Sequence, residues 1–423
     1  MELWYKSLTY LFYPFSRIYL FLRKLNKKEH PTRFKEKLSK ISIARGEGFL
    51  IWLHAVSVGE VMSILPLIEN FEKNIKISKI LITTTTLSSA GLIEKKLIKY
   101  KKTVHQFLPL DITIYVQKFL DHWKPNLSIF VDSEIWPNTI FKIKEKKIPL
   151  LLINARITKK TFYRWKLFKK FSQSIFEKFD LCLVANNETE GYLKFLGAKN
   201  IKSCGNLKFS DIENQSEYDL KTDILEKIHD RKIWCAASTH PNEEIFCAKT
   251  HLLIKKKINN ILTIIVPRHI ERAKKISIEL SKLNIKTVLY SNYKELNNDT
   301  DILLIDSYGE LKKIYNISKN VFLGKSLTNA LAKDSGQNPI EASRLGCKIF
   351  HGPFVSNFVE IYDFLKLLKV TQLINTPSEL SKFLLSELNI VKENNNNVKQ
   401  KIDKYGIDIL NNVIKEIKIY INN

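Results

Sequence analysis

Short apolar runs alternate with longer amphipathic stretches along most of the chain. From residue 49 onward the runs have the length and β-branched content of buried strands, and the stretches between them have helical spacing. This alternation is typical of a parallel sheet covered by helices on both faces. The strands predicted in the first half are 49–54, 79–82, 127–131, 150–153 and 181–185, with a further short run near Ile201.

The alternation starts again after a polar stretch at residues 211–223, which we interpret as an interdomain linker. A chain of 423 residues exceeds the usual size of one hydrophobic core, so two domains are expected. Residues 394–397 are predicted to be a loop, followed by a closing helix at 408–421. The strands predicted in the second half are 233–237, 261–266, 285–289, 302–305, 321–323 and 348–350.

The first 30 residues are expected to form a membrane-associated segment. Residues 3–22 are aromatic and aliphatic, but Lys6, Pro14 and Arg17 interrupt them. They fit neither a spanning helix nor a cleavable signal. We expect an interfacial anchor, and the alternative is a buried amphipathic helix that covers the first domain. The rings and cations suited to headgroup depth are Trp4, Tyr5, Tyr10, Tyr13, Tyr19, Arg23, Lys24, Lys27 and Lys28.

The formal charge of +25 would attract anionic partners such as a membrane surface. Lysine is used heavily throughout, however, so a compositional habit of the genome explains the charge equally well. Nucleic acid is not expected as a partner, because zinc spacing, an RNP-type strand and an isolated basic helix are all lacking. The five cysteines are odd in number and far apart, which favours reduced packing residues over disulfides or a metal site.

One carboxylate follows the first predicted strand. The strand breaks at Ser57 and Gly59, and Glu60 stands at the start of the next helix. A carboxylate there is favoured by the helix dipole, so a capping role is one interpretation. The other is a general base at the lip of a cleft, which removes the proton of a hydroxyl nucleophile as the new bond forms.

A second carboxylate, Glu134, lies in the strand-end loop 131–138 beside Trp136 and Pro137. The loop either holds a functional carboxylate in a rigid polar corner or merely starts a helix, with Pro137 in its first turn. Both interpretations remain open.

Basic and amide side chains follow the strand predicted at 150–153. Asn154 and Arg156 come directly after it, and further lysines follow. This run is either a solvated face or a site for an acceptor phosphate, because the guanidinium fork suits phosphate oxygens.

Polar clusters also end the predicted strands of the second half. His240 and His269 each close one such cluster, and Arg268 suits a phosphate. Either histidine taken singly could be a satisfied structural residue, but two clusters on one sheet favour a shared ligand. Residues 334–341 lead into a helix whose small Ser335 and Gly336 would let backbone N–H groups reach an anion. An ordinary capped helix is the alternative.

In their order along the chain, these segments resemble the signature segments of the 3-deoxy-D-manno-octulosonic acid (Kdo) transferases. The resemblance runs from about residue 33 to residue 360, and several ordered segments are far more specific than one. The segments of the first half are 54–60 (HAVSVGE), 134–138 (EIWPN), 154–156 (NAR) and 205–208 (GNLK). Those of the second half are 238–240 (STH), 267–269 (PRH), 309–311 (GEL), 336–341 (GQNPIE), 352–353 (GP) and 357–358 (NF).

The resemblance implies an α/β fold of the GT-B type, with two doubly wound parallel-sheet domains facing each other across a cleft. Residues 1–30 would be the anchor, 31–210 the acceptor-binding domain and 211–423 the CMP-Kdo-binding domain, whose last helix can pack back on the first. The implied reaction transfers Kdo from CMP-Kdo to a lipid A precursor (lipid IVA), with inversion, in lipopolysaccharide core biosynthesis. It would take place on the cytoplasmic side of the inner membrane.

Beyond the donor substrate, no cofactor and no metal is expected. Two other functions stay open: another GT-B glycosyltransferase that uses a UDP-sugar, and a non-catalytic basic membrane adaptor. The oligomeric state and the number of sugars transferred are left undetermined by the sequence.

The strand-end pattern and the resemblance together give the candidate site residues. Glu60 is the expected base, and Glu134 is the second catalytic candidate. The expected acceptor contacts are Ser57, Asn154 and Arg156. The family generally has two glycines where Ser335 precedes Gly336, and glycine is common at the position of Asn242. The residues expected to hold the cytidine phosphate are Lys208, Ser238, Arg268, His269, Gly309, Glu310, Leu311, Ser335, Gly336, Asn338 and Glu341.

Overall fold

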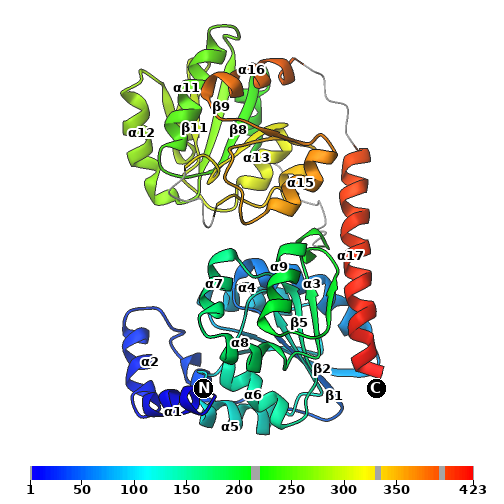
Figure 1. The fold of residues 1–423 in the computed structure, drawn as a ribbon. Helices are drawn as coiled ribbons and strands as arrows, with labels where there is room; N and C mark the ends of the chain where they lie inside the picture. The colour runs from blue at the N-terminus through cyan, green and yellow to red at the C-terminus, as the bar shows by residue number, and fades with distance from the viewer. Residues whose placement is uncertain (1, 211–219, 329–334, 390–395, 423) are drawn as a thin grey trace. The chain divides into compact units, whose positions relative to one another are not determined.

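The chain folds into two compact α/β units (Figure 1). The computed structural model describes residues 2–210, 220–328, 335–389 and 396–422. Unit 1 comprises residues 1–212 and 403–423, and unit 2 comprises residues 213–402. Each unit is built on a seven-stranded sheet whose neighbouring strands are all parallel. The prediction of two doubly wound parallel sheets is therefore confirmed.

The sheet of unit 1 has the order β3-β2-β1-β4-β5-β6-β7. The chain starts in the middle at β1, moves outward to β3, and returns to β4 on the other side of β1. The loops after β1 and β4 therefore run in opposite directions, and such a switch point opens a crevice at the carboxyl ends of the strands. The strands are β1 Phe49–His54, β2 Ile77–Thr84, β3 Thr103–Phe107, β4 Leu127–Val131, β5 Leu150–Ala155, β6 Leu181–Val184 and β7 Ile201–Ser203.

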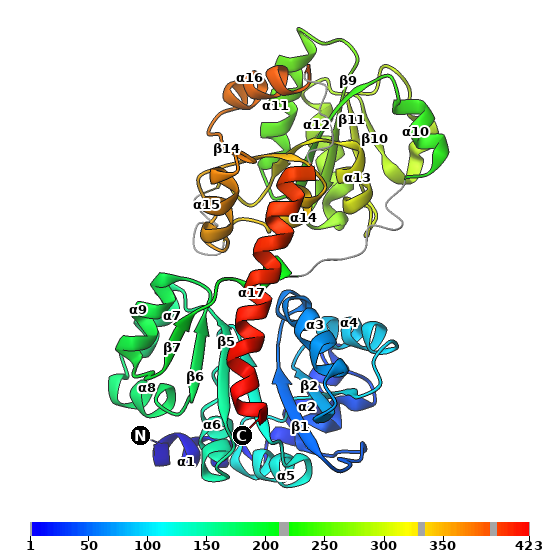
Figure 2. The same ribbon diagram turned by 90° about the vertical axis from the view of Figure 1, so that its right-hand side faces the viewer.

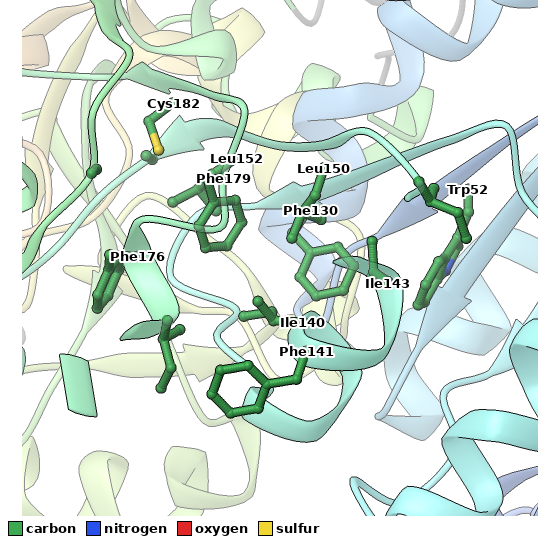
Figure 3. Packing of buried hydrophobic residues seen from close by; sticks show 14 of the residues in the cluster. Trp52, Phe130, Ile140, Phe141, Ile143, Leu150, Leu152, Phe176, Phe179 and Cys182 are labelled. Carbon is green, nitrogen blue, oxygen red and sulfur yellow. The ribbon is translucent and has the colours of Figure 1, made fainter. Parts of the chain in front are cut away.

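Helices cover this sheet, and buried aromatic side chains fill the space between them. In Figure 3, Trp52 of β1 and Phe130 of β4 lie beside Ile140 and Ile143 of one covering helix, α6. β3 was not predicted, because its His105 and Gln106 interrupt the apolar pattern although both are buried at the sheet edge. The helices are α3 Val58–Lys73, α4 Leu87–Leu97, α5 Thr113–Trp123, α6 Pro137–Glu145, α7 Lys159–Lys166, α8 Lys169–Phe176 and α9 Asn187–Leu196, with the 3-10 helices η1 Arg33–Leu38 and η2 Leu207–Ser210.

Segments from both ends of the chain pack on unit 1. The N-terminal helices are α1 (Glu2–Phe12) and α2 (Ser16–Leu25), and the long C-terminal helix is α17 (Asn396–Asn422). The α17 residues from Asp403 onward lie along unit 1 (Figure 2), where Glu416 pairs with Lys202 at 2.7 Å.

The sheet of unit 2 has the order β10-β11-β9-β8-β12-β13-β14, with its switch point between β8 and β12. β14 was not predicted, because two of its three residues, Thr371 and Gln372, are polar and leave no apolar run. The strands are β8 Lys232–Thr239, β9 Ile261–Pro267, β10 Thr287–Leu289, β11 Ile302–Leu304, β12 Asn320–Leu323, β13 Lys348–His351 and β14 Thr371–Leu373. The helices are α10 Thr222–Ile228, α11 Glu243–Lys255, α12 Ala273–Ser281, α13 Leu311–Ile317, α14 Ile340–Arg344, α15 Val359–Leu367 and α16 Pro377–Glu387, with the 3-10 helices η3 Ile270–Arg272 and η4 Tyr290–Glu295.

Candidate active site

Glu60 stands in the first turn of α3, directly after the loop that follows β1. Ser57 is the N-cap residue, and its Oγ accepts a hydrogen bond from the Glu60 N–H at 3.2 Å. The Glu60 carboxylate reaches back to accept from the Val56 N–H and from the Ser57 hydroxyl, both at 2.7 Å. The arrangement resembles a capping box, except that Glu60 accepts the N–H of Val56 in place of that of the N-cap Ser57, so the capping interpretation holds. It also fixes the carboxylate at the switch point of the sheet.

The surroundings of Glu60 change its acidity. Burial raises the pKa of Glu60 to about 7, hydrogen bonds from Ser57 and Val56 oppose that shift, and the negative charges of Asp132 and Glu134 add to it. A carboxylate with a pKa near neutrality is suited to act as a general base at physiological pH.

Asp132 is a member of this cluster that the sequence-based site did not include. It follows β4 with a left-handed φ of 62°, in a region that aspartate tolerates better than most residues. Burial raises the pKa of Asp132, while the charges of Lys208 and Arg156 act against that shift. Its place directly after a predicted strand, two residues before Glu134, was the signal that could have identified it.

Glu134 is held by two aromatic neighbours. Trp136 Nε1 donates to Glu134 Oε2 at 3.0 Å, and His54 Nε2 lies 3.6 Å from the same oxygen. His54 is fully buried, and its Nε2 has no hydrogen-bond partner among the described residues. Pro137 also starts α6, as one interpretation of this loop expected, while a functional role of the Glu134 carboxylate stays a prediction.

The basic residues of unit 1 come from the end of β5 and from η2. Asn154, with φ 49°, accepts the Leu207 N–H at 2.9 Å through its side-chain oxygen. It thereby ties η2, which carries Lys208, to the strand that leads to Arg156. The structure thus brings Arg156 and Lys208 to Asp132, while Asn154 holds the two segments together.

In unit 2, polar side chains gather at the carboxyl ends of the neighbouring strands β8 and β9. Ser238 is the second-last residue of β8, and His240, Arg268 and His269 follow the two strands. The Arg268 N–H donates to the Thr239 carbonyl at 3.0 Å, and the rings of His240 and His269 lie 6.1 Å apart. Burial lowers the pKa of His240, and the charges of Lys325, His269 and Arg268 lower it further. The two strand-end clusters are therefore one basic group. Ser238 has a left-handed φ of 54°, and Asn242, where glycine was the expected residue, has one of 78°.

Residues 309–311 follow β11 on the same sheet. Glu310 accepts from the Tyr290 hydroxyl at 3.1 Å and pairs with Lys313 at 3.2 Å. Its carboxylate is thus held by neighbouring side chains, and Gly309 lies exposed beside it. Leu311 begins α13.

The segment 335–341 leads into α14, a helix of only five residues that begins at Ile340. So short a helix has little dipole, and an anion here would depend on backbone N–H groups and basic side chains. Ser335 is buried and bonded to Ser356, and Gly336, with φ 84°, leaves no room for a Cβ against Val355 Cα. Asn338 is exposed and caps the Ile340 N–H, and Glu341 pairs with Lys312 at 3.0 Å. The first residue of the predicted segment, Asp334, lies outside the described residues.

A buried carboxylate that was not predicted joins these loops. Glu243, at the start of α11, is 1% exposed. It accepts the N–H groups of His240 at 2.9 Å and Lys325 at 2.7 Å on one oxygen. Its other oxygen accepts those of Ser326 at 2.9 Å and Leu327 at 3.2 Å. The loops after β8 and β12 are therefore fixed to each other through one side chain.

Comparisons with known proteins agree on one family. The profile described as 3-deoxy-D-manno-octulosonic-acid transferase (kdotransferase) matches residues 32–211. The 3-deoxy-D-manno-octulosonic acid transferase of Rickettsia bellii is 33% identical over 361 residues, which cover 85% of this chain and 84% of that protein. A probable mitochondrial 3-deoxy-D-manno-octulosonic acid transferase of Arabidopsis thaliana is 31% identical over 99% of this chain and 95% of its own length. The solved structure of a putative UDP-N-acetylglucosamine 2-epimerase from Listeria monocytogenes matches 88% of this chain and 96% of its own, with a TM-score of 0.56 and 14% identity, which shows the fold alone.

Proposed function

The chain belongs to the Kdo transferase family, and from this premise we propose a donor, an acceptor and a mechanism for its transfer of Kdo. It is a glycosyltransferase of the GT-B fold. The proposed donor is CMP-Kdo, and the proposed acceptor is a lipid A precursor, lipid IVA. The reaction is a single displacement that inverts the anomeric carbon, in lipopolysaccharide core biosynthesis.

The proposal depends above all on the Glu60 cluster of unit 1. Glu60 takes the proton of the acceptor hydroxyl while the hydroxyl oxygen bonds to the anomeric carbon and the bond to the cytidine phosphate breaks. Its pKa of about 7 supports this role, because the carboxylate is available as a base yet holds the proton it receives. Ser57, Asn154 and Arg156 are proposed acceptor contacts, and Glu134 assists Glu60 by its negative charge.

The basic group of unit 2 supports the assignment of the donor. The leaving group carries a phosphate, and the guanidinium of Arg268, beside the rings of His240 and His269, suits that charge. We propose that Ser238, His269 and residues 309–311 complete the donor site with Ser335, Gly336, Asn338 and Glu341. Lys208 is proposed to compensate the developing phosphate charge, together with Arg268.

We propose a peripheral place on the inner membrane, on its cytoplasmic side, and the exposed apolar side chains of the N-terminal helices support contact with a membrane surface. Within the described residues, we find no helix with the length and apolarity that crossing a bilayer requires. Instead, α1 is fastened to unit 1, since Tyr5 donates to Asp111 at 3.1 Å and Asn138 donates to Thr9 at 2.9 Å. The large apolar side chains that α1, α2 and the turn between them leave exposed are Leu3, Trp4, Leu8, Tyr10, Leu11, Phe12, Phe15, Ile18, Tyr19, Phe21, Leu22 and Leu25.

Removing two of these side chains is expected to weaken docking on acidic vesicles. Trp4 and Leu11 are 68% and 70% exposed, so Trp4→Ser with Leu11→Ser should leave the fold intact. The affinity should fall by about tenfold or more, because burying one large apolar side chain contributes about 1.5–3 kcal/mol. Co-sedimentation with vesicles measures it. The control is Ile75→Ser with Leu367→Ser, since these two side chains lie elsewhere on the chain and are 95% and 82% exposed. Equal losses of vesicle affinity in the two double variants would contradict docking through the N-terminal helices.

Neutralising Glu134 is expected to move the acid limb of the rate profile to lower pH. Turnover should fall as the pH drops below about 7, because Glu60 then gains a proton. Glu134→Gln removes a negative charge that raises the pKa of Glu60, so Glu60 should stay ionised to lower pH. Turnover measured against pH for the variant and the unaltered chain tests this prediction. An unchanged acid limb would show that the charge of Glu134 does not act on Glu60.

The transfer itself is tested by incubating the purified protein with CMP-Kdo and a tetraacylated lipid A precursor, followed by mass analysis of the lipid. A gain of one or more Kdo units is the expected result and also counts the sugars added. No gain with CMP-Kdo, but a gain with a UDP-sugar, would overturn the assignment of the donor.

A further inference from the structure

Lys325 has a backbone conformation that disfavours any residue with a side chain. It follows β12 and Gly324, and its φ is 58°, in the left-handed region. A lysine there costs roughly 1 kcal/mol or more relative to glycine, and such strain persists only where the surrounding structure fixes it.

Both backbone groups of Lys325 are fixed. Its N–H donates to Glu243 at 2.7 Å, and its carbonyl accepts the Gly336 N–H at 2.7 Å. The oxygen of Glu243 that binds Lys325 also accepts the His240 N–H. Lys325 is thereby held between the loop after β8 and the segment that contains Ser335 and Gly336, and both belong to the proposed donor site.

The side chain of Lys325 adds a charge to a group that is already basic. It is half-buried, and its charge acts on His240 together with those of Arg268 and His269. These side chains come from the loops after three adjacent strands, β9, β8 and β12. The positive charges of Arg268 and Lys325 act on the same His240 ring, and an anion bound between these two cations relieves their mutual repulsion.

We propose that Lys325 is a further donor-binding residue, which contacts the phosphate of the nucleotide and is positioned for this by Glu243. The inference rests on the proposed function, and it deepens it by adding to the donor site a cation that neither the strand-end pattern nor the family resemblance assigned. The proposal also explains the strained backbone. The left-handed φ of Lys325 places a charged side chain at a position where the loop conformation favours glycine.

The test is Lys325→Gly, measured by calorimetric titration of the full chain with cytidine 5′-monophosphate and by thermal unfolding. Glycine suits a φ of 58°, so the unfolding midpoint should not fall. The affinity for the nucleotide should drop about tenfold, and its dependence on salt should weaken, because one charge-assisted contact is lost. Lys325→Arg should retain the affinity of the unaltered chain.

The matched control is Lys369→Gly. Lys369 also has a φ of 58° in unit 2, but it lies exposed between α15 and β14, before the amino end of that strand, whereas Lys325 follows the carboxyl end of β12. Its replacement should leave nucleotide affinity unchanged. If Lys325→Gly binds the nucleotide as the unaltered chain does, or if both glycine variants lose affinity equally, the role of Lys325 is overturned. If the unaltered chain fails to bind the nucleotide, the proposed donor fails instead.

Discussion

Replacing Glu60 by glutamine is expected to reduce turnover by about 10²- to 10⁴-fold, the usual contribution of a general base. The amide cannot take the proton of the acceptor hydroxyl. It can still occupy the capping box of α3, since glutamine serves at this position almost as well as glutamate. Affinity for cytidine 5′-monophosphate should not change, because the proposed donor-binding residues around Arg268 lie in unit 2. Mass analysis of the lipid product gives the turnover, and calorimetry gives the affinity.

The control for Glu60 lies on the same helix. Glu69 lies on the surface of α3 and pairs with Lys99. Glu69→Gln therefore changes the charge of α3 by the same amount as Glu60→Gln, but at a distance from the Glu60 cluster. Its turnover should stay within about twofold of the unaltered chain. A Glu60→Gln protein that transfers Kdo as fast as Glu69→Gln would remove Glu60 from the role of base.

Periodicity was sufficient to predict the central strands and the edge strands β7 and β10, but not the edge strands β3 and β14. β4, for instance, has the predicted bounds, because all five of its residues are buried and only Ser128 departs from an apolar run. In β3, buried polar residues interrupt the apolar run, and in β14 two of the three residues are polar. Such strands depend on pairing with a neighbour, which a local pattern does not encode.

The sequence was sufficient to predict those site residues that closely follow a predicted strand. Glu60 and Arg268 could be named because each directly follows an apolar run. Glu243 could not, because its role depends on loops more than 80 residues apart that meet only in the fold. Lys325 stands two residues after the strand predicted at 321–323, but its left-handed backbone and its contact with Glu243 are properties of the folded loop.

Replacing Gly406 by alanine is expected to loosen α17 from unit 1 and to reduce both stability and turnover. A Cβ at Gly406 would lie 1.9 Å from the Phe209 carbonyl oxygen, so either the helix or η2 has to move. Overpacking of this kind costs about 1–3 kcal/mol, which corresponds to a fall of roughly 2–12 °C in the unfolding midpoint of a domain of this size. Because η2 also carries Lys208, turnover should fall with it.

Gly191 provides the opposite substitution within the same unit. It lies inside α9, and a Cβ added there would meet no other atom within 4 Å, so Gly191→Ala should raise stability by up to about 1 kcal/mol through helix propensity. Thermal unfolding of the two variants should therefore shift in opposite directions. If Gly406→Ala also raised the midpoint, the close contact between α17 and η2 would not exist in solution, and the C-terminal helix would have no part in holding Lys208.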